Sequence, residues 1–162
     1  MKLVAISAGE SSSSKTTALV APIVADHRGR LIELSALSAD GLLGRRDDPD
    51  VADAVAAAAG ADVLVVATPI YRATYTGAMK AFFDRFEPDA LANTAVVLCA
   101  TAMVREHFLA LDTSGRALIA SLGGWTVPTV VYAARDDFTD GMPSHGLVER
   151  LRTAVLEARR VT

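Results

Sequence analysis

Short apolar runs alternate with amphipathic segments along most of the chain. Val63–Thr68 is apolar and rich in β-branched residues, as expected of a central parallel strand that is covered on both faces. A helix is predicted over Thr76–Phe86, where Met79 and three later phenylalanines recur at i, i+3, i+4 and i+7, the spacing of a core-facing stripe. The same reasoning predicts further strands at Leu3–Ser7, Arg30–Leu34, Ala95–Ala100 and Thr126–Ala133.

Helices are predicted between these strands. Pro22 lies inside the first helix, so a kink or an early stop is expected there. The second helix follows a loop at Ser35–Asp50, with Asp50 as its N-cap and Gly60 as its C-terminal stop. The predicted helical ranges are Thr16–Asp26, Val51–Ala59, part of His107–Leu122, and Gly146–Arg160, the last of which follows a polar loop at Ala134–His145.

The alternation of five strands with helices indicates an α/β fold. Such a pattern favours a doubly wound, five-stranded parallel sheet with helices on both faces. For a chain of 162 residues we expect a single domain over residues 1–162 and the strand order 2-1-3-4-5. In that order, ligands bind at the carboxyl ends of the strands, between the first and the third. The loops that follow these two strands are the most distinctive in the sequence.

Composition and charge exclude several classes of protein. Half of the residues are hydrophobic (51%), which is typical of a folded globular chain. The net charge of −3 is spread along the chain and gives no basic surface for nucleic acid. No signal peptide or membrane-length apolar stretch is visible, so a cytoplasmic location is expected.

Cysteine and acidic residues give little indication of a metal site. The single Cys99 excludes an internal disulfide and a cysteine zinc cage, and its apolar neighbours predict a buried thiol. Three aspartates and His145 lie close together in the polar loop before the last helix, but they lack ligand spacing. We therefore expect no bound metal and interpret this group as a surface or a subunit contact.

The loop after the first strand has the composition of a phosphate-binding loop. Residues 8–17 read AGESSSSKTT and lead directly into a helix. Hydroxyls, backbone amides and a lysine at a helix N-terminus favour an anion. A flexible serine linker is the alternative, although a linker rarely joins a strand to its own helix.

Nucleotide hydrolysis is a second interpretation of the same loop. Gly9, Lys15 and Thr16 fit the P-loop pattern, but Ser14 occupies the position of its second glycine. The third and fourth strands do not end in an aspartate that could hold magnesium, so this interpretation is disfavoured. A receiver domain is also disfavoured, because Glu10 alone does not supply its acidic cluster.

The loop after the third strand would suit a flat ligand with polar edges. Residues 68–77 present two aromatic side chains, one guanidinium and several backbone amides at the expected ligand-binding edge. Tyr71 could contact such a ligand or anchor the loop, and Arg72 could neutralise an anion or face solvent.

Together the two loops resemble those of the NADPH-dependent FMN reductase family. The resemblance rests on ATPIYRATYTGAMKAFFD (67–84), SAGESSSSKTTALV (7–20) and a longer stretch at 96–138. It implies a flavodoxin-like fold, FMN as a cofactor or substrate, and NADPH or NADH as the reductant. It also implies a homodimer or homotetramer, for which the tyrosines and the loop Ala134–His145 are candidate contacts.

The resemblance also implies specific flavin-binding positions. Those expected at the FMN phosphate are Ser11, Ser14, Lys15, Thr16 and Thr17. Those expected along the flavin ring are Pro69, Ile70, Tyr71 and Arg72 on one loop and Thr101, Ala102 and Met103 on another. His107 and Asp112 match polar positions in the segment that follows, although a structural role is favoured for His107.

Four residues depart from the family pattern. Ala102-Met103 stands where a glycine pair is common, and Thr113 replaces a bulky residue. Ser11 stands in place of an arginine, so Lys15 would be the nearest cation to the phosphate. Trp125 follows two glycines, and we expect it in the core or at an interface rather than on the flavin.

The expected activity needs no catalytic side chain, because a flavin carries the chemistry. The resemblance therefore implies an NAD(P)H-dependent FMN reductase that transfers a hydride to flavin N5. A flavin-dependent monooxygenase is the expected recipient of reduced FMN. The alternatives are a quinone or azo reductase that keeps its FMN bound and a non-enzymatic, flavodoxin-type electron carrier.

Overall fold

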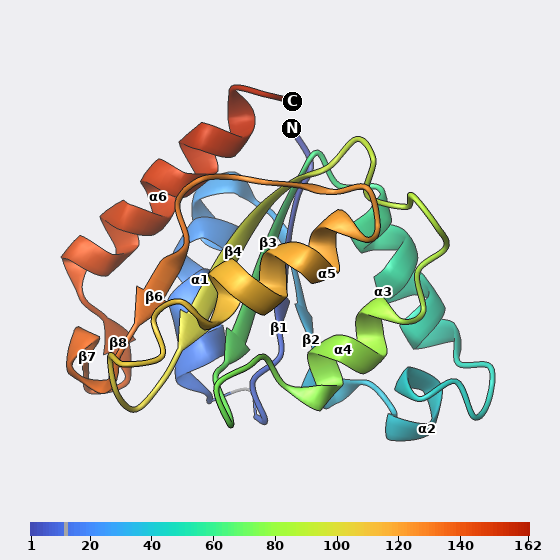
Figure 1. Ribbon diagram of the computed structural model, residues 1–162, viewed down its shortest axis with the longest axis horizontal. Coiled ribbons are helices and arrows are strands. Elements are labelled where there is room, and N and C mark those ends of the chain that lie inside the picture. Colours follow the sequence, from blue (N-terminus) through green and yellow to red (C-terminus); the bar gives the residue numbers. More distant parts are fainter. Residues whose placement is uncertain (12) are drawn as a thin grey trace.

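The computed structural model describes residues 1–11 and 13–162, which fold around one parallel sheet (Figure 1). Its strands run in the order β2-β1-β3-β4-β5, with β6 also paired to β4. This confirms the predicted fold class and strand order. The strands are β1 (Leu3–Ser7), β2 (Arg30–Glu33), β3 (Val63–Pro69), β4 (Ala95–Thr101), β5 (Trp125–Thr126) and β6 (Val131–Ala133).

The fifth strand is divided into two pieces, where the sequence predicted one continuous strand. β5 and β6 each pair in parallel with β4, and residues 127–130 between them lie outside both strands. Pro128 has no N–H for a sheet hydrogen bond. Arg116 instead donates to the carbonyls of Val127 at 2.8 Å and Pro128 at 2.7 Å, so the break is held by a side chain.

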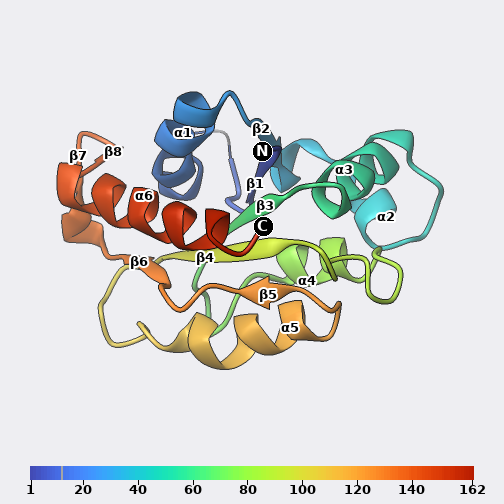
Figure 2. The same ribbon diagram turned by 90° about the horizontal axis from the view of Figure 1, so that it is seen from above.

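Helices cover both faces of the sheet (Figure 2). Along β3, Val63 and Val65 pack with residues of α1 (Lys15–His27) and α6 (His145–Arg159), and the alternate residues face the other layer. Successive residues of a strand point to opposite faces of the sheet. When helices cover both faces, the residues that point to each face must therefore be apolar. The second layer contains α3 (Pro49–Ala59), α4 (Gly77–Phe83) and α5 (Arg116–Ala120).

Several helix boundaries differ from the predicted ones. α1 continues through Pro22 to His27, so the early stop was wrong. The N-cap of α3 is Asp48 rather than Asp50, because the Asp48 carboxylate accepts from two first-turn N–H groups and Pro49 is the first helical residue. Gly60 caps the other end as predicted. α4 ends three residues early, although Phe86 remains buried as expected.

Two predicted loops contain regular structure. The segment at 35–50 holds a 3₁₀ turn, η1 (Leu34–Ala36), and a short helix, α2 (Ala39–Leu42). The segment at 134–145 holds η3 (Arg135–Asp137) and a hairpin of β7 (Phe138–Thr139) with β8 (Met142–Pro143). The partly helical segment before α5 contains a π-helical turn, η2 (Leu111–Gly115).

Cys99 lies in the buried core, as predicted, and burial raises the pKa of its thiol.

In the part of the chain that the structure describes, no helix is both long and apolar enough to cross a membrane.

Candidate functional site

Three loops leave the carboxyl edge of the sheet side by side. They follow β1, β3 and β4, which are direct neighbours. Backbone hydrogen bonds continue the pairing just beyond the strand ends. These bonds run from Ala8 N–H to the Ala67 carbonyl (2.8 Å), from Ile70 N–H to the Thr101 carbonyl (2.8 Å), and from Ala102 N–H to the Ala133 carbonyl (2.9 Å). The loop positions are therefore fixed by the sheet itself.

The three loops enclose a cavity of about 260 Å³, called the edge cavity below. Ten of the twelve predicted flavin-binding residues line it. Thr17 and Arg72 are the two that do not, and Gly9 and Glu10 line it in addition. The full lining is Gly9, Glu10, Ser11, Ser14, Lys15, Thr16, Pro69, Ile70, Tyr71, Thr101, Ala102 and Met103.

The loop before α1 is drawn tightly around a serine. Ser14 is the N-cap of α1, and its hydroxyl accepts from the Thr17 N–H at 3.1 Å. Gly9 lies directly against it, since a Cβ at position 9 would be only 2.1 Å from Ser14 Oγ. Only glycine leaves room for this approach, which brings the loop backbone and the first turn of α1 to the same side of the cavity.

The two threonines of this helical turn are buried and face the protein. Thr16 shares a 2.7 Å hydrogen bond with Thr101, which joins the first loop to the end of β4. Thr17 shares one of 2.8 Å with Ser7 and donates to the Glu33 carboxylate at 3.2 Å. The Thr17 side chain therefore braces α1 against β1 and β2, which explains why it does not line the cavity.

Lys15 has an aromatic partner that lies far from it in the sequence. Its ammonium nitrogen is 5.2 Å from the centre of the Phe138 ring, which belongs to the β7–β8 hairpin. This is the geometry of a cation–π interaction. This contact could not be predicted from the sequence, because residue 138 was expected to lie in a loop.

The loop after β3 makes a tight two-residue turn. Tyr71 N–H donates to the Thr74 carbonyl at 3.1 Å, and Thr74 N–H donates back at 3.3 Å. Arg72 and Ala73 between them have φ values of 52° and 63°, the left-handed backbone of a type I′ turn that glycine or asparagine usually supplies. The turn presents Tyr71 to the edge cavity and leaves the Arg72 side chain exposed.

A second cavity of about 480 Å³ adjoins the first. Gly9, Glu10 and Tyr71 line both. Burial, followed by the charge of the nearby Glu10 carboxylate, raises the pKa of the Tyr71 phenol above its usual value. Sequence reasoning considered Glu10 only as part of an acidic cluster and missed its place at this border; its position inside the phosphate-loop segment was the available signal.

Other residues considered from the sequence lie outside the edge cavity. Asp112 pairs with Arg116 at 3.0 Å, so it supports the guanidinium that holds the break in the fifth strand. His107 is partly buried and does not line the cavity. Trp125 is 47% exposed at the opposite edge of the sheet, so it does not lie in the core, and its place at a subunit interface stays a prediction. Within residues 1–11 and 13–162, no three His, Cys, Asp or Glu side chains gather where they could hold a metal ion.

Comparisons with known proteins agree on one family. A family model described as NADPH-dependent FMN reductase matches residues 1–139. The NADH-dependent FMN reductase SfnF of Pseudomonas fluorescens is 35% identical over 168 residues, covering 98% of this chain and 90% of the relative. An FMN reductase (NADPH) of Pseudomonas aeruginosa is 35% identical, covering 97% of this chain and 90% of the relative.

A solved structure gives the same result for the fold. The apo form of the NADH:FMN oxidoreductase EMOB matches with a TM-score of 0.88 and 32% identity, over 99% of this chain and 90% of that one. These findings confirm the resemblance that the two loops predicted, and with it the flavodoxin-like fold.

Proposed function

The chain belongs to the NADPH-dependent FMN reductase family, and we propose that it oxidises NADH or NADPH while reducing FMN at the edge cavity. The observation that carries this proposal is the convergence of three strand-end loops on one cavity, which is lined by ten of the twelve residues expected to bind flavin. Size alone would not have selected this cavity, since the adjoining one is larger.

The residues present fit the phosphate end of FMN. The first turn of α1 and the backbone at Gly9 face the cavity, and a helix N-terminus favours an anion. The cradle depends on the absence of a side chain at position 9, because a Cβ there would displace Ser14. Ser11, Ser14 and Lys15 would hold the phosphate in this arrangement.

The residues of the other two loops fit a flat ring. Pro69 and Ile70 supply apolar lining from one loop, and Ala102 and Met103 supply it from the neighbouring loop. The ends of these loops are joined by the hydrogen bond from Ile70 N–H to the Thr101 carbonyl, so the loops do not move independently. FMN, when bound, would supply the hydride-accepting chemistry.

The protein would contribute binding and orientation rather than an acid or a base. The carboxyl edge would hold the acceptor in fixed loops, and the adjoining cavity offers space for a second ligand beside it. The Tyr71 hydroxyl can donate a hydrogen bond at the border of the two cavities, where burial raises the pKa of its phenol.

We further propose that reduced FMN leaves the enzyme for a flavin-dependent monooxygenase and that the protein forms a homodimer or homotetramer. Tyr71 is 49% exposed and the β7–β8 hairpin is also largely exposed, so both are available for subunit contacts. The cytoplasmic location and the single-domain organisation stay predictions.

Steady-state oxidation of NADH and NADPH tests the function. We expect rapid oxidation that depends on added FMN and follows its concentration to saturation. A yellow protein that oxidises the nicotinamide only with a quinone or a dye would instead be a reductase that keeps its flavin. A stable one-electron reduced flavin with slow direct oxidation would indicate an electron carrier. Absence of both flavin binding and oxidation would contradict the proposal.

A further inference from the structure

One acidic and one basic side chain line the edge cavity. Among the described residues that line it, Glu10 and Lys15 are the charged ones, and their charges cancel. Glu10 directly precedes Ser11 in the loop expected to hold the phosphate. Its exposed side chain therefore lines the same cavity as Ser11, Ser14 and Lys15, the residues that would hold the phosphate.

Lys15 does not fully offset this carboxylate. Its ammonium group is placed over the Phe138 ring, 5.2 Å from the ring centre, on the side of the β7–β8 hairpin. The interaction gives the cation a second partner that competes with a phosphate for its position. Ser11, the next residue of the loop, is uncharged, so it supplies no second cation.

We propose that Glu10 is an affinity-determining residue that weakens the hold of this loop on the 5′-phosphate of FMN. The inference rests on the proposed function and deepens it. A phosphate carries nearly two negative charges at neutral pH, so a carboxylate that lines the same cavity opposes its binding. The isoalloxazine ring is neutral and does not experience this repulsion. The carboxylate thus favours exchange of FMN with solution, as required of a flavin that is passed on rather than retained.

The proposal concerns the phosphate of FMN and not its ring. Riboflavin lacks the phosphate, so a comparison of the affinities for FMN and riboflavin tests it. Glu10 also lies near Tyr71, which offers a competing explanation. If Glu10 acted by positioning Tyr71 beside the ring, its removal would change the affinities for FMN and riboflavin alike. If it acts by charge on the phosphate, only FMN responds.

The experiment titrates the flavin-free protein with FMN and with riboflavin, following quenching of flavin fluorescence. We expect Glu10→Gln to bind FMN about three- to tenfold more tightly, because the substitution removes one unit of negative charge at a solvent-exposed site. The affinity for riboflavin should stay within about twofold of the wild-type value. Lys15→Gln should weaken FMN binding and leave riboflavin unchanged. Added salt should shrink the difference between Glu10→Gln and the wild type.

Glu87→Gln is the matched control, because Glu87 is an exposed carboxylate that does not line the edge cavity. It should leave both affinities unchanged. Equal changes for FMN and riboflavin in Glu10→Gln, or no change for FMN, would overturn the inference while leaving the proposed function intact. Failure of the wild-type protein to bind either flavin would overturn both.

Discussion

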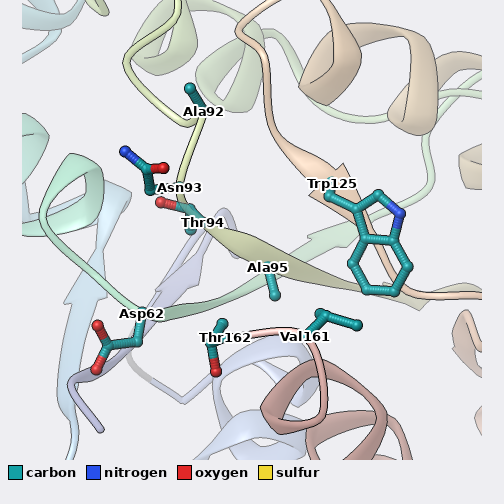
Figure 3. A pocket seen from close by; sticks show the side chains of 8 residues that line it. All are labelled: Asp62, Ala92, Asn93, Thr94, Ala95, Trp125, Val161 and Thr162. Carbon is teal, nitrogen blue, oxygen red and sulfur yellow. The ribbon is translucent and has the colours of Figure 1, made fainter.

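The two edges of the sheet both carry cavities, but they differ in what surrounds them. The amino edge has a cavity of about 510 Å³, larger than the edge cavity of about 260 Å³. In Figure 3, Asp62 lies on one side of it and Trp125 on the other, with Val161 and Thr162 between them. Volume therefore does not identify the site, since a further cavity of about 560 Å³ beside Tyr132 and Arg150 is larger than both.

Two polar side chains at the amino edge, Asp62 and Thr94, are engaged within the protein itself. Asp62 accepts from the Lys2 N–H at 2.6 Å, and the Thr94 hydroxyl donates to the Ala61 carbonyl at 3.1 Å. At the carboxyl edge, by contrast, α1 begins beside the cavity at Lys15. A helix start favours anions and a helix end disfavours them. Helix direction thus distinguishes the edges where cavity volume does not.

The largest expected effect comes from adding one methyl group to the carboxyl edge. Gly9→Ala would place a Cβ 2.1 Å from Ser14 Oγ, so the N-cap must shift. We expect FMN affinity to fall at least about tenfold, since displacement of a cap alone costs about 1 kcal/mol and the phosphate cradle is distorted as well. Fluorescence titration measures the affinity, and circular dichroism checks the fold.

Gly146→Ala provides the control for this change. Nothing lies within 4 Å of a Cβ at position 146 in α6, so FMN affinity should stay at the wild-type value. Equal losses in the two variants would show that the cradle is not the cause.

A second prediction is that Arg116 stabilises the sheet without affecting the binding of FMN at its carboxyl edge. Arg116→Met removes the donors that pair with the carbonyls of Val127 and Pro128 and with Asp112. We expect the free energy of unfolding to fall by about 2 kcal/mol, because partly buried carbonyls lose their partners. The folded variant should bind FMN as the wild type does. Urea denaturation and flavin titration measure the two quantities, and a large loss of affinity without a loss of stability would contradict this division.

The turn after β3 provides a third prediction, about backbone strain at the carboxyl edge. Ala73 has a φ of 63°, where a residue with a Cβ is disfavoured. Ala73→Gly should therefore raise the free energy of unfolding by roughly 0.5–1 kcal/mol. The same substitution at Ala56, an exposed position inside α3, should lower it by a similar amount. Changes of the same sign in thermal denaturation would rule out strain at position 73.

The smallest effect is expected at the amino edge. Trp125→Ala removes a large side chain that is 47% exposed, and we expect the free energy of unfolding to change by less than about 1 kcal/mol. FMN affinity should not change, because the flavin loops leave the other edge. A measurable loss of flavin affinity in this variant would mean that the larger cavity takes part in binding.

Much of the site could be predicted because the chemistry is local in the sequence. Hydroxyls, a lysine and a helix start adjoin one another in the first loop, and the strand order brings that loop beside the other two. What could not be predicted depends on contacts between distant residues. The placement of Lys15 over Phe138 and the bond between Thr16 and Thr101 each join segments far apart in the chain.

Local competition between similar residues caused the remaining errors. Asp48 and Asp50 are both good N-cap residues, and the outcome was decided by Pro49, which suits the first helical position. The fifth strand was predicted as continuous from its apolar pattern, but Pro128 interrupts the hydrogen bonding and Arg116 replaces it. The spacing of apolar residues cannot predict that a distant arginine side chain will supply hydrogen bonds in place of a sheet neighbour.

Backbone amide NMR during an FMN titration tests most directly which edge of the sheet binds flavin. We expect the largest shifts at Gly9, Ser14, Ile70 and Ala102, around the edge cavity, with Asp62, Thr94 and Trp125 unmoved. Shifts concentrated at the amino edge, or none at saturating FMN, would contradict the account.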